Sequence, residues 1–348
     1  MASDLTDARP TTNGSRAAPD PGVAPDPGVA LVMGASRGLG LLLCEELLRR
    51  GHVVHGCARD REELERAAVI LATAVPGSRF VTHVGDVRAQ DSVSEVVDDV
   101  VGAQGRLDAA FHVAGVIQVG HADAVTLGHY QDAVDTMLWG PVHLSLAVLP
   151  VMREAGHGRL GIVSSVGGLV AVPRLVPYSV AKFGAVGLAE GLHAELSGTG
   201  VTVTAVTPGL MRTGGHTHAR FVDDPTADYA WFAPLASLPG LSISAQRAAR
   251  RIVSGVLAGR PTVELTPLTV IGRRVHGVAP ATTIRAMGLV SRLMPGPTAA
   301  AADPTSTAAP GLEGSAARSR LGSRVVDALS VLGDRAARRT NELGARRP

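Results

Sequence analysis

Short apolar runs alternate with amphipathic segments from residue 29 to residue 208, and this alternation constrains the fold more than any other feature of the sequence. The apolar runs, which we expect to form strands, are 29–33, 52–58, 79–84, 107–115, 159–164 and 201–208. The segments with helical periodicity are 39–51, 61–74, 91–105, 126–154 and 177–197. Apolar runs of this length suit strands that are buried on both faces. The alternation therefore predicts an α/β fold: a doubly wound parallel sheet with helices on both faces and right-handed crossovers.

The two ends of the chain differ in composition from this central part. The hexamer APDPGV occurs at 18–23 and again at 24–29, and a segment so rich in proline and glycine cannot bury enough apolar surface to fold. Beyond residue 208 the pattern loosens, although 246–258 is typical of a helix and 261–265 of a strand. We expect a disordered N-terminal tail at 1–28, a single main domain at 29–265, a C-terminal extension at 266–295, a low-complexity linker at 296–317 and a basic amphipathic tail at 318–348.

Charge and composition argue against several classes of protein. The 348 residues carry a net charge of +2, which gives no reason to expect nucleic-acid binding. The two cysteines, Cys44 and Cys57, lie in apolar periodic segments and are expected to be buried thiols rather than a disulfide or a metal site. The first 28 residues lack an apolar signal-peptide core, and no apolar run reaches the ~18 residues of a membrane span, so we expect a cytoplasmic protein.

A glycine-rich loop, GASRGLG, joins the first expected strand to the first expected helix. Glycine allows a sharp turn and a close approach of the backbone to a pyrophosphate, and the N–H groups at the start of the helix favour an anion at the same point. An ordinary strand–helix turn is the alternative interpretation. The loop residues that we expect to hold a dinucleotide are Gly34, Ser36, Arg37, Gly38, Leu39 and Gly40.

The residue at the end of the second strand indicates which dinucleotide would bind. A carboxylate there would bond the ribose 2′-hydroxyl of NAD, whereas an arginine suits the 2′-phosphate of NADP. Arg59 stands at this point, and Arg37 in the loop adds a second cation. Asp60 follows directly, and we assign it to capping the helix at 61–74. The sequence therefore favours NADP(H) over NAD(H), unless both arginines are only solvated surface charges.

Tyr178 and Lys182 are candidates for acid–base catalysis. Lys182 is the only lysine in the chain and follows Tyr178 by four residues, which places both side chains on one face of a helix. An isolated tyrosine has a pKa of about 10, and a neighbouring ammonium, compact and with three donors, lowers that pKa by stabilising the phenolate. Ser165 lies 13 residues before Tyr178, at a strand end where an open parallel sheet places its ligand crevice. Its hydroxyl can hold a substrate carbonyl against the tyrosine.

Over about 29–265, the chain resembles the short-chain dehydrogenase/reductase family in its single-domain form, which has a Rossmann fold. The matching positions are the glycine pattern Gly34-x3-Gly38-x-Gly40, Asp86-Val87, Ala114-Gly115, Ser165, Tyr178-x3-Lys182, and Pro208-Gly209 with Thr213. The resemblance implies an NADP(H)-dependent enzyme that interconverts a small-molecule carbonyl and an alcohol by hydride transfer.

The resemblance also implies a role for each matching residue. Ser165 would orient the carbonyl, Tyr178 would move the proton, and Lys182 would lower the pKa of Tyr178 and bond the nicotinamide ribose. The residues implied to bind the rest of the cofactor are Asp86 and Val87 beside the adenine, Ala114 and Gly115, and Pro208, Gly209 and Thr213 on the nicotinamide side. Residues 210–245 would form a lid over the substrate.

Two departures from the family pattern weaken the expected proton relay. The family usually has asparagine where this chain has His112-Val113, and Met137 in TMLWG replaces the asparagine that holds a relay water. A thioether is only a weak acceptor. A nucleotide-binding protein of the same fold with little or no turnover, acting as a sensor or a subunit partner, is therefore the alternative function. A serine hydrolase is not expected, because no Gly-x-Ser-x-Gly elbow surrounds Ser165.

The lid and the tail leave other questions open. Four of the ten aromatic residues lie in the lid, which suggests either an apolar substrate or a lid that packs on itself. His216 and His218 form an H-x-H pair without a third metal ligand, so no metal site is predicted.

The tail carries an apolar helical stripe among arginines, at Leu321, Val325, Leu329, Leu332 and Ala336. That helix would meet a membrane surface or a partner, or dock on its own domain or a sister subunit. The family resemblance implies a homodimer or homotetramer through 126–154 and 178–197.

Overall fold

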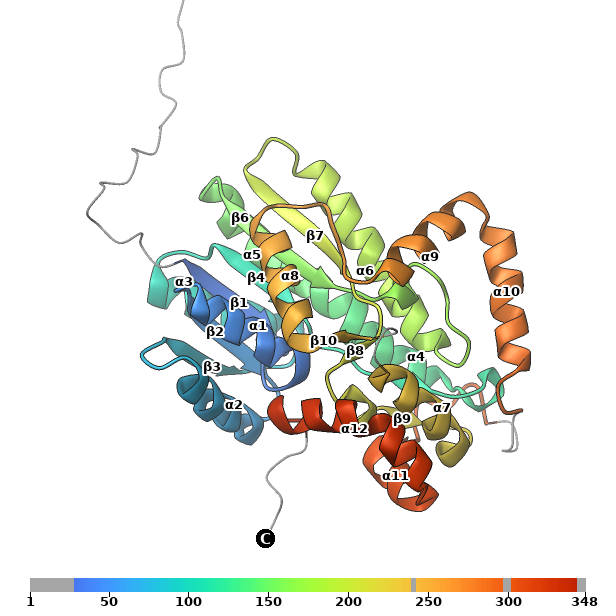
Figure 1. Cartoon of the computed structure of the whole chain (residues 1–348). Coiled ribbons are helices and arrows are strands. Elements are labelled where there is room, and N and C mark those ends of the chain that lie inside the picture. The colour runs from blue at the N-terminus through green and yellow to red at the C-terminus, as the bar shows by residue number, and fades with distance from the viewer. Residues whose placement is uncertain (1–27, 239–241, 297–301, 343–348) are drawn as a thin grey trace, which may run out of the picture.

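The computed structural model describes residues 28–238, 242–296 and 302–342. The predicted N-terminal tail at 1–28 thus lies outside the described residues except for Gly28. The strands of the main sheet are β1 (Val29–Met33), β2 (Val53–Ala58), β3 (Phe80–Val84), β4 (Ala109–His112), β6 (Gly158–Val163), β7 (Val201–Thr207) and β11 (Thr262–Glu264). They form one seven-stranded sheet in the order β11-β7-β6-β4-β1-β2-β3, and every neighbouring pair is parallel (Figure 1). The predicted doubly wound parallel sheet is confirmed.

Helices cover both faces of this sheet (Figure 1). One face packs against α1 (Gly38–Arg49), α2 (Arg61–Ala74) and α8 (Ala245–Leu257), and the other against α3 (Gln90–Gln104), α5 (Gly140–Glu154) and α6 (Val176–Glu195). Strand β1 supplies both cores, since Ala30 and Val32 point to the first face and Leu31 and Met33 to the second. A strand buried on both sides needs apolar residues at every position, which is why β1 is a continuous apolar run in the sequence.

The helix predicted at 126–154 is interrupted in its middle. It consists of α4 (Leu127–Val134), a π-helical turn at Asp135–Trp139, and α5. The stretch Leu127–Glu154 is long and apolar enough to cross a membrane by length and composition alone; in the structure α5 packs against α3, and α4 packs against α6. The π turn changes the helical register and leaves Thr136 and Met137 buried.

The lid contains α7 and several short elements. Its strands and helix are β8 (Met211–Arg212), β9 (Arg220–Phe221), α7 (Pro225–Ser237) and β10 (Ile243–Ser244), and β9 pairs with β5 (Gln118–Val119) and with β12 (Leu312–Glu313). Residues 312–317, which we predicted to be the end of a linker, therefore lie in β12 and in α11 (Gly314–Leu321). The reason is local packing, because Leu312 pairs with Phe221 and joins the apolar cluster under α7.

Two pairs of helices follow the main domain. The first pair, α9 (Pro267–Val278) and α10 (Pro280–Arg292), extends away from the sheet (Figure 1), and no residue of α10 is buried. The second pair is α11 and α12 (Arg324–Arg339), and both helices pack against α7. Thus the tail docks on its own domain, which was one of our alternatives for this segment.

The face that α12 buries is not the apolar stripe that the sequence suggested. Val325 and Leu329 are exposed, whereas Gly333, Asp334 and Ala337 are buried against the lid. Small residues allow the two backbones to come close: a Cβ added to Gly214 would overlap the Cβ of Ala337. An ion pair between Asp334 Oδ1 and His216 Nε2, at 3.1 Å, joins the same two surfaces.

Candidate active site

Ser165, Tyr178 and Lys182 come together at the carboxyl end of β6. Ser165 follows this strand and caps the 3-10 turn Val166–Gly168, its Oγ accepting a hydrogen bond from the N–H of Gly167 at 3.1 Å. Tyr178 and Lys182 lie in the first two turns of α6, and a proline in the first turn fixes the start of that helix. Ser165 and Tyr178 are neighbours, since a Cβ added to Gly167 would lie 3.1 Å from Tyr178 Cε1 and 3.7 Å from Ser165 Oγ, and Lys182 Nζ lies 5.7 Å from the centre of the Tyr178 ring.

Lys182 is held in a fixed position inside the molecule. Its side chain is 4% exposed, and its Nζ donates a hydrogen bond to the carbonyl oxygen of Val163 at 2.8 Å. Ser164 Oγ donates to the carbonyl oxygen of Lys182 at 2.8 Å and so ties the helix to the end of β6. Burial lowers the pKa of Lys182 to about 7, because the ammonium has lost most of its contact with water.

The pKa of Tyr178 differs from the sequence expectation. We expected Lys182 to lower it, but burial raises the pKa of Tyr178, and the hydrogen bond with Ser165 opposes this only in part. The Lys182 ammonium lies over the face of the ring and bonds to Val163, so its charge does not offset the desolvation of the hydroxyl in this arrangement. Burial thus moves both groups toward their neutral forms.

A cavity of about 660 Å³ opens at the carboxyl ends of β1, β2 and β4. The predicted cofactor residues that line it are Gly34, Ser36, Arg37, Gly38, Leu39, Gly40, Arg59, Asp86, Val87, Ala114 and Gly115. Gly34 and Gly38 have φ values of +96° and +57°, which other residues rarely adopt, and this backbone brings the start of α1 to the cavity wall. The lining residues are therefore those expected around the phosphates and the adenosine of a dinucleotide.

The charged groups around the cavity pair mainly with one another. Asp86 Oδ2 accepts a 2.6 Å bond from Arg88, and these bonds lower the pKa of Asp86 although burial alone would raise it. Asp60 Oδ1 accepts from the N–H of Glu63 at 2.9 Å, so its predicted role as the cap of α2 is confirmed. Arg59 is exposed at the rim of the cavity, where it can reach an anionic ligand.

Five of the predicted cofactor residues do not line this cavity: Tyr178, Lys182, Pro208, Gly209 and Thr213. Gly209 packs against Thr266, since a Cβ there would lie 2.6 Å from Thr266 Oγ1. Val116 connects the two regions, because it lines the cavity and also packs in the cluster that includes Tyr178. The cavity and the Ser165–Tyr178–Lys182 group are thus neighbours in the structure.

Comparisons with known proteins agree with this geometry. The family model described as short chain dehydrogenase matches residues 28–221. The chain belongs to the short-chain dehydrogenase family. The 3-ketodihydrosphingosine reductase of Bacteroides thetaiotaomicron is 31% identical over 184 residues, which are 53% of this chain and 64% of the reductase.

Two solved structures extend the comparison. A short-chain dehydrogenase from Streptomyces avermitilis has a TM-score of 0.65 and 29% identity, covering 77% of this chain and 98% of that one. An actinorhodin polyketide ketoreductase variant solved with NADPH has a TM-score of 0.62 and 28% identity, covering 70% and 97%.

This short-chain dehydrogenase also contains site residues that sequence reasoning missed. Glu63 accepts hydrogen bonds from Ser36 Oγ at 2.9 Å and from Arg37 Nη1 at 2.7 Å, so Arg37 is already paired with an acid. Glu63 lies in the first turn of α2, close to the cap residue Asp60, and this position was the feature of the sequence that could have indicated its role at the glycine loop. Glu342 also lines the cavity, and no pattern in the tail indicated that.

The expected relay position is apolar in this short-chain dehydrogenase. Met137 is 1% exposed and packs with Ala133 and Ala181 next to Tyr178. Thr136, beside it in the π turn, lines the cavity, and its buried Oγ1 has no hydrogen-bond partner among the described residues. Burial and the nearby Lys182 charge lower the pKa of His112 to about 3, so this residue is neutral.

The lid aromatics pack against each other. Phe221, Tyr229 and Phe232 meet edge to face with ring centres 5.7 to 5.9 Å apart, and all three are buried. Trp231 donates a 3.1 Å hydrogen bond to Asp228 within α7. Of our two interpretations, the structure therefore supports the lid that packs on itself.

The H-x-H pair of the lid is divided between two partners. His216 Nε2 lies 3.1 Å from Asp334, and His218 Nε2 lies 2.6 Å from the carbonyl oxygen of Glu342. Within the described residues no group of three or more His, Cys, Asp or Glu side chains could hold a metal ion. Cys44 and Cys57 are free and buried, as predicted, and burial raises the pKa of both thiols.

Proposed function

We propose that this short-chain dehydrogenase is an NADP(H)-dependent oxidoreductase that interconverts a carbonyl and an alcohol, with Tyr178 as the general acid and base. The observation that carries the proposal is the position of Tyr178. Its ring and the Ser165 hydroxyl both lie against Gly167, and the buried Lys182 Nζ lies 5.7 Å from its ring centre. A hydroxyl pair beside a buried amine can bind a carbonyl oxygen and deliver a proton to it.

The residues around the cavity fit the cofactor. The glycine loop would hold the pyrophosphate at the start of α1, and Asp86 and Val87 would lie beside the adenine. When bound, the nicotinamide ring supplies or accepts the hydride. The related ketoreductase structure was solved with NADPH, which supports the same choice of cofactor here.

The three catalytic candidates have separate tasks in this proposal. Ser165 orients the carbonyl oxygen, and Tyr178 donates its phenolic proton to that oxygen during reduction. The phenolate that remains is an anion in a buried site, where a nearby positive charge stabilises it more strongly than in water. Lys182 supplies that charge in its protonated form, and its Nζ lies 5.7 Å from the centre of the Tyr178 ring.

A low-turnover binding protein is the second candidate. The buried Met137 favours it, because a thioether at that position holds a relay water poorly. The test is an assay of the purified full chain for NADPH oxidation with ketones, aldehydes and quinones, together with calorimetric titration of NADPH. Turnover supports the oxidoreductase, whereas binding without turnover supports the second candidate. If the protein neither binds NADPH nor oxidises it, the proposal is contradicted.

Arg59 is expected to set the preference for NADP(H), since Arg37 is already paired with Glu63 at 2.7 Å. We expect Arg59→Leu to weaken NADPH binding by about 10-fold or more, the value of one charge-assisted hydrogen bond, and to change NADH binding little. The measurement is the Kd of each dinucleotide, with the exposed Arg153→Leu as the control. Equal losses for NADPH and NADH would contradict this role of Arg59.

We also propose that copies associate through α5, α6 and the π turn before α5. Large apolar side chains are exposed there: Trp139 is 51% exposed, Leu146 57% and Val180 47%. Such side chains gathered on neighbouring helices are typical of an interface rather than of a solvated surface. A homodimer or homotetramer is the assembly that this surface supports.

A further inference from the structure

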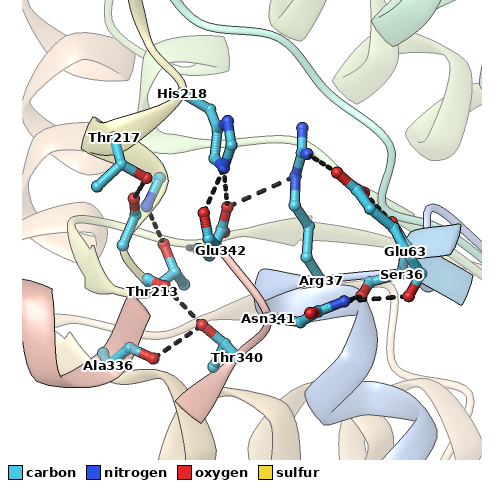
Figure 2. A network of polar contacts seen from close by, with 12 residues as sticks. Ser36, Arg37, Glu63, Thr213, Thr217, His218, Ala336, Thr340, Asn341 and Glu342 are labelled. Carbon is cyan, nitrogen blue, oxygen red and sulfur yellow. Dashed lines mark hydrogen bonds and ion pairs between the residues drawn. The ribbon is translucent and has the colours of Figure 1, made fainter. Parts of the chain in front are cut away.

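The residues that follow α12 run across the glycine loop (Figure 2). The carbonyl oxygen of Thr340 accepts a hydrogen bond from the N–H of Gly38 at 2.8 Å, and Thr340 Oγ1 donates to the carbonyl oxygen of Thr213 at 2.8 Å. Asn341 Nδ2 donates to the carbonyl oxygens of Ser36 at 2.8 Å and Glu63 at 3.1 Å. The segment Thr340–Glu342 therefore joins the loop, the start of α2 and the lid.

The Glu342 carboxylate lies directly over the start of α1. A Cβ added to Gly38 would lie 2.6 Å from Glu342 Oε1, so the carboxylate fills the space that this glycine leaves open. Glu342 Oε2 is 3.5 Å from Arg37 Nε and 3.4 Å from His218 Nε2 (Figure 2). The residue is only 7% exposed.

These partners are the groups that a phosphate would need. A glycine-loop N–H at the start of a helix and an arginine beside it form an anion site. In this chain Gly38 N–H is bonded to Thr340, and Arg37 contacts Glu342 and Glu63. The Glu342 carboxyl group carries acceptor oxygens, as a phosphate does, and it contacts the same loop and arginine, so it can take the position of a phosphate group.

We propose that Thr340–Glu342 is an intramolecular plug that occupies the phosphate end of the cleft, so that a dinucleotide binds only after this segment has left. This inference rests on the proposed function in one respect, namely that the chain binds a dinucleotide. The plug reduces the apparent affinity by the fraction of molecules in which the cleft is open.

The segment can leave without unfolding the domain. Its anchor, α12, is held independently of it, because Asp334 pairs with His216 and Arg318 and Ala337 packs on Gly214. The contacts of Thr340–Glu342 themselves are polar, and water can replace them. Asn341 adopts a φ of +59°, which a non-glycine residue rarely adopts, so the docked path is conformationally restricted.

A proline at position 341 tests the plug in the full-length chain. Proline fixes φ near −65° and cannot follow the docked path, whereas Asn341→Gly keeps that path and loses only the two side-chain bonds. We expect Asn341→Pro to bind NADPH about 10-fold or more tightly than the wild type, as an opened cleft requires. We expect Asn341→Gly to increase the affinity for NADPH by less than Asn341→Pro does. The measurement is the Kd from calorimetry, with thermal unfolding to verify folding and the exposed Glu154→Gln as a surface control.

Hydrogen exchange of the wild-type protein gives a test that needs no variant. If the segment leaves when NADPH binds, peptides that cover 336–342 should exchange faster with NADPH present, although the glycine loop becomes protected. Slower exchange of 336–342, or weaker binding by Asn341→Pro, would show that the segment clasps the dinucleotide and would overturn the plug. An unchanged Kd together with unchanged exchange would also overturn it.

The plug should also depend on pH. Burial raises the pKa of Glu342 from 4.5 to about 7, the nearby Glu63 adds to this rise, and the Arg37 charge opposes it. His218, with its own pKa lowered by burial, faces the same carboxylate from the lid. Because the docked form holds the proton more tightly than the released form, docking is favoured below about pH 5 and weakens as the pH rises through about 7. The Kd of the wild type for NADPH, divided by the Kd of Glu342→Gln, should therefore fall as the pH rises from about 5 to about 7. A ratio that stays constant over this range would contradict the pH dependence of the plug.

These outcomes separate the plug from the proposed function. If no variant binds NADPH or NADH, the proposed function fails and the plug with it. If NADPH binds and is turned over but Asn341→Pro leaves both the Kd and the exchange pattern unaltered, only the plug fails. The two conclusions therefore stand or fall on different measurements.

Discussion

Tyr178→Phe is expected to reduce kcat for carbonyl reduction by about 10²–10⁴-fold, the contribution of a positioned general acid. The substitution removes only the phenolic oxygen and leaves the ring that packs beside Met137. The cavity that fits the dinucleotide does not include Tyr178 in its lining, so the Kd of NADPH should change by less than a few fold. We expect the loss to appear in kcat rather than in the Kd of NADPH, because the proton moves only as the substrate reacts.

The measurement is steady-state NADPH oxidation with the best substrate from the carbonyl panel. Tyr130→Phe is a matched control, since Tyr130 lies in α4 and is also partly exposed, yet takes no part in the Ser165–Tyr178–Lys182 group. We expect this control to keep at least half of the wild-type kcat. A Tyr178→Phe protein with activity close to that of Tyr130→Phe would assign the proton to another donor.

Arg174→Met should destabilise the protein by about 3–5 kcal/mol, the cost of removing one partner from a buried ion pair. Arg174 is in the loop before α6, and its Nη1 lies 3.2 Å from Asp223 and 3.5 Å from Asp228. All three side chains are 3% exposed or less. Burial already raises the pKa of Asp228, so without this guanidinium its charge becomes still more costly.

The free energy of unfolding in urea measures this loss, with the exposed Arg153→Met as the control. Adding Asp228→Asn to Arg174→Met should recover part of the lost stability, because it removes a buried charge that has lost its cation. The arginine also ties the lid to the loop before α6, since its side chain bonds Asp223 of the lid, and its carbonyl oxygen accepts a 3.0 Å bond from the N–H of Gly120 next to β5. A loss below about 1 kcal/mol, typical of surface pairs, would contradict this interpretation.

Local patterns in the sequence were sufficient for the fold. The strand at 29–33 matches β1 because a strand with both faces buried must be apolar throughout, and the helix at 61–74 matches α2 because Asp60 caps it and its apolar side repeats. The pairing of Tyr178 with Lys182 follows from helical geometry alone. Each of these features depends on residues that are near one another in the chain.

What the sequence by itself determined is therefore the parallel sheet, the glycine loop and the placement of the Ser165, Tyr178 and Lys182 side chains in one region. Only the tertiary structure decided which face α12 buries, and that Asn341 reaches Ser36, 305 residues earlier in the chain. It also decided the pKa of Tyr178 and of Lys182, since the loss of water around a group depends on every segment packed against it. Periodicity describes neighbours along the chain, whereas burial and docking are set by segments that meet only when the chain has folded.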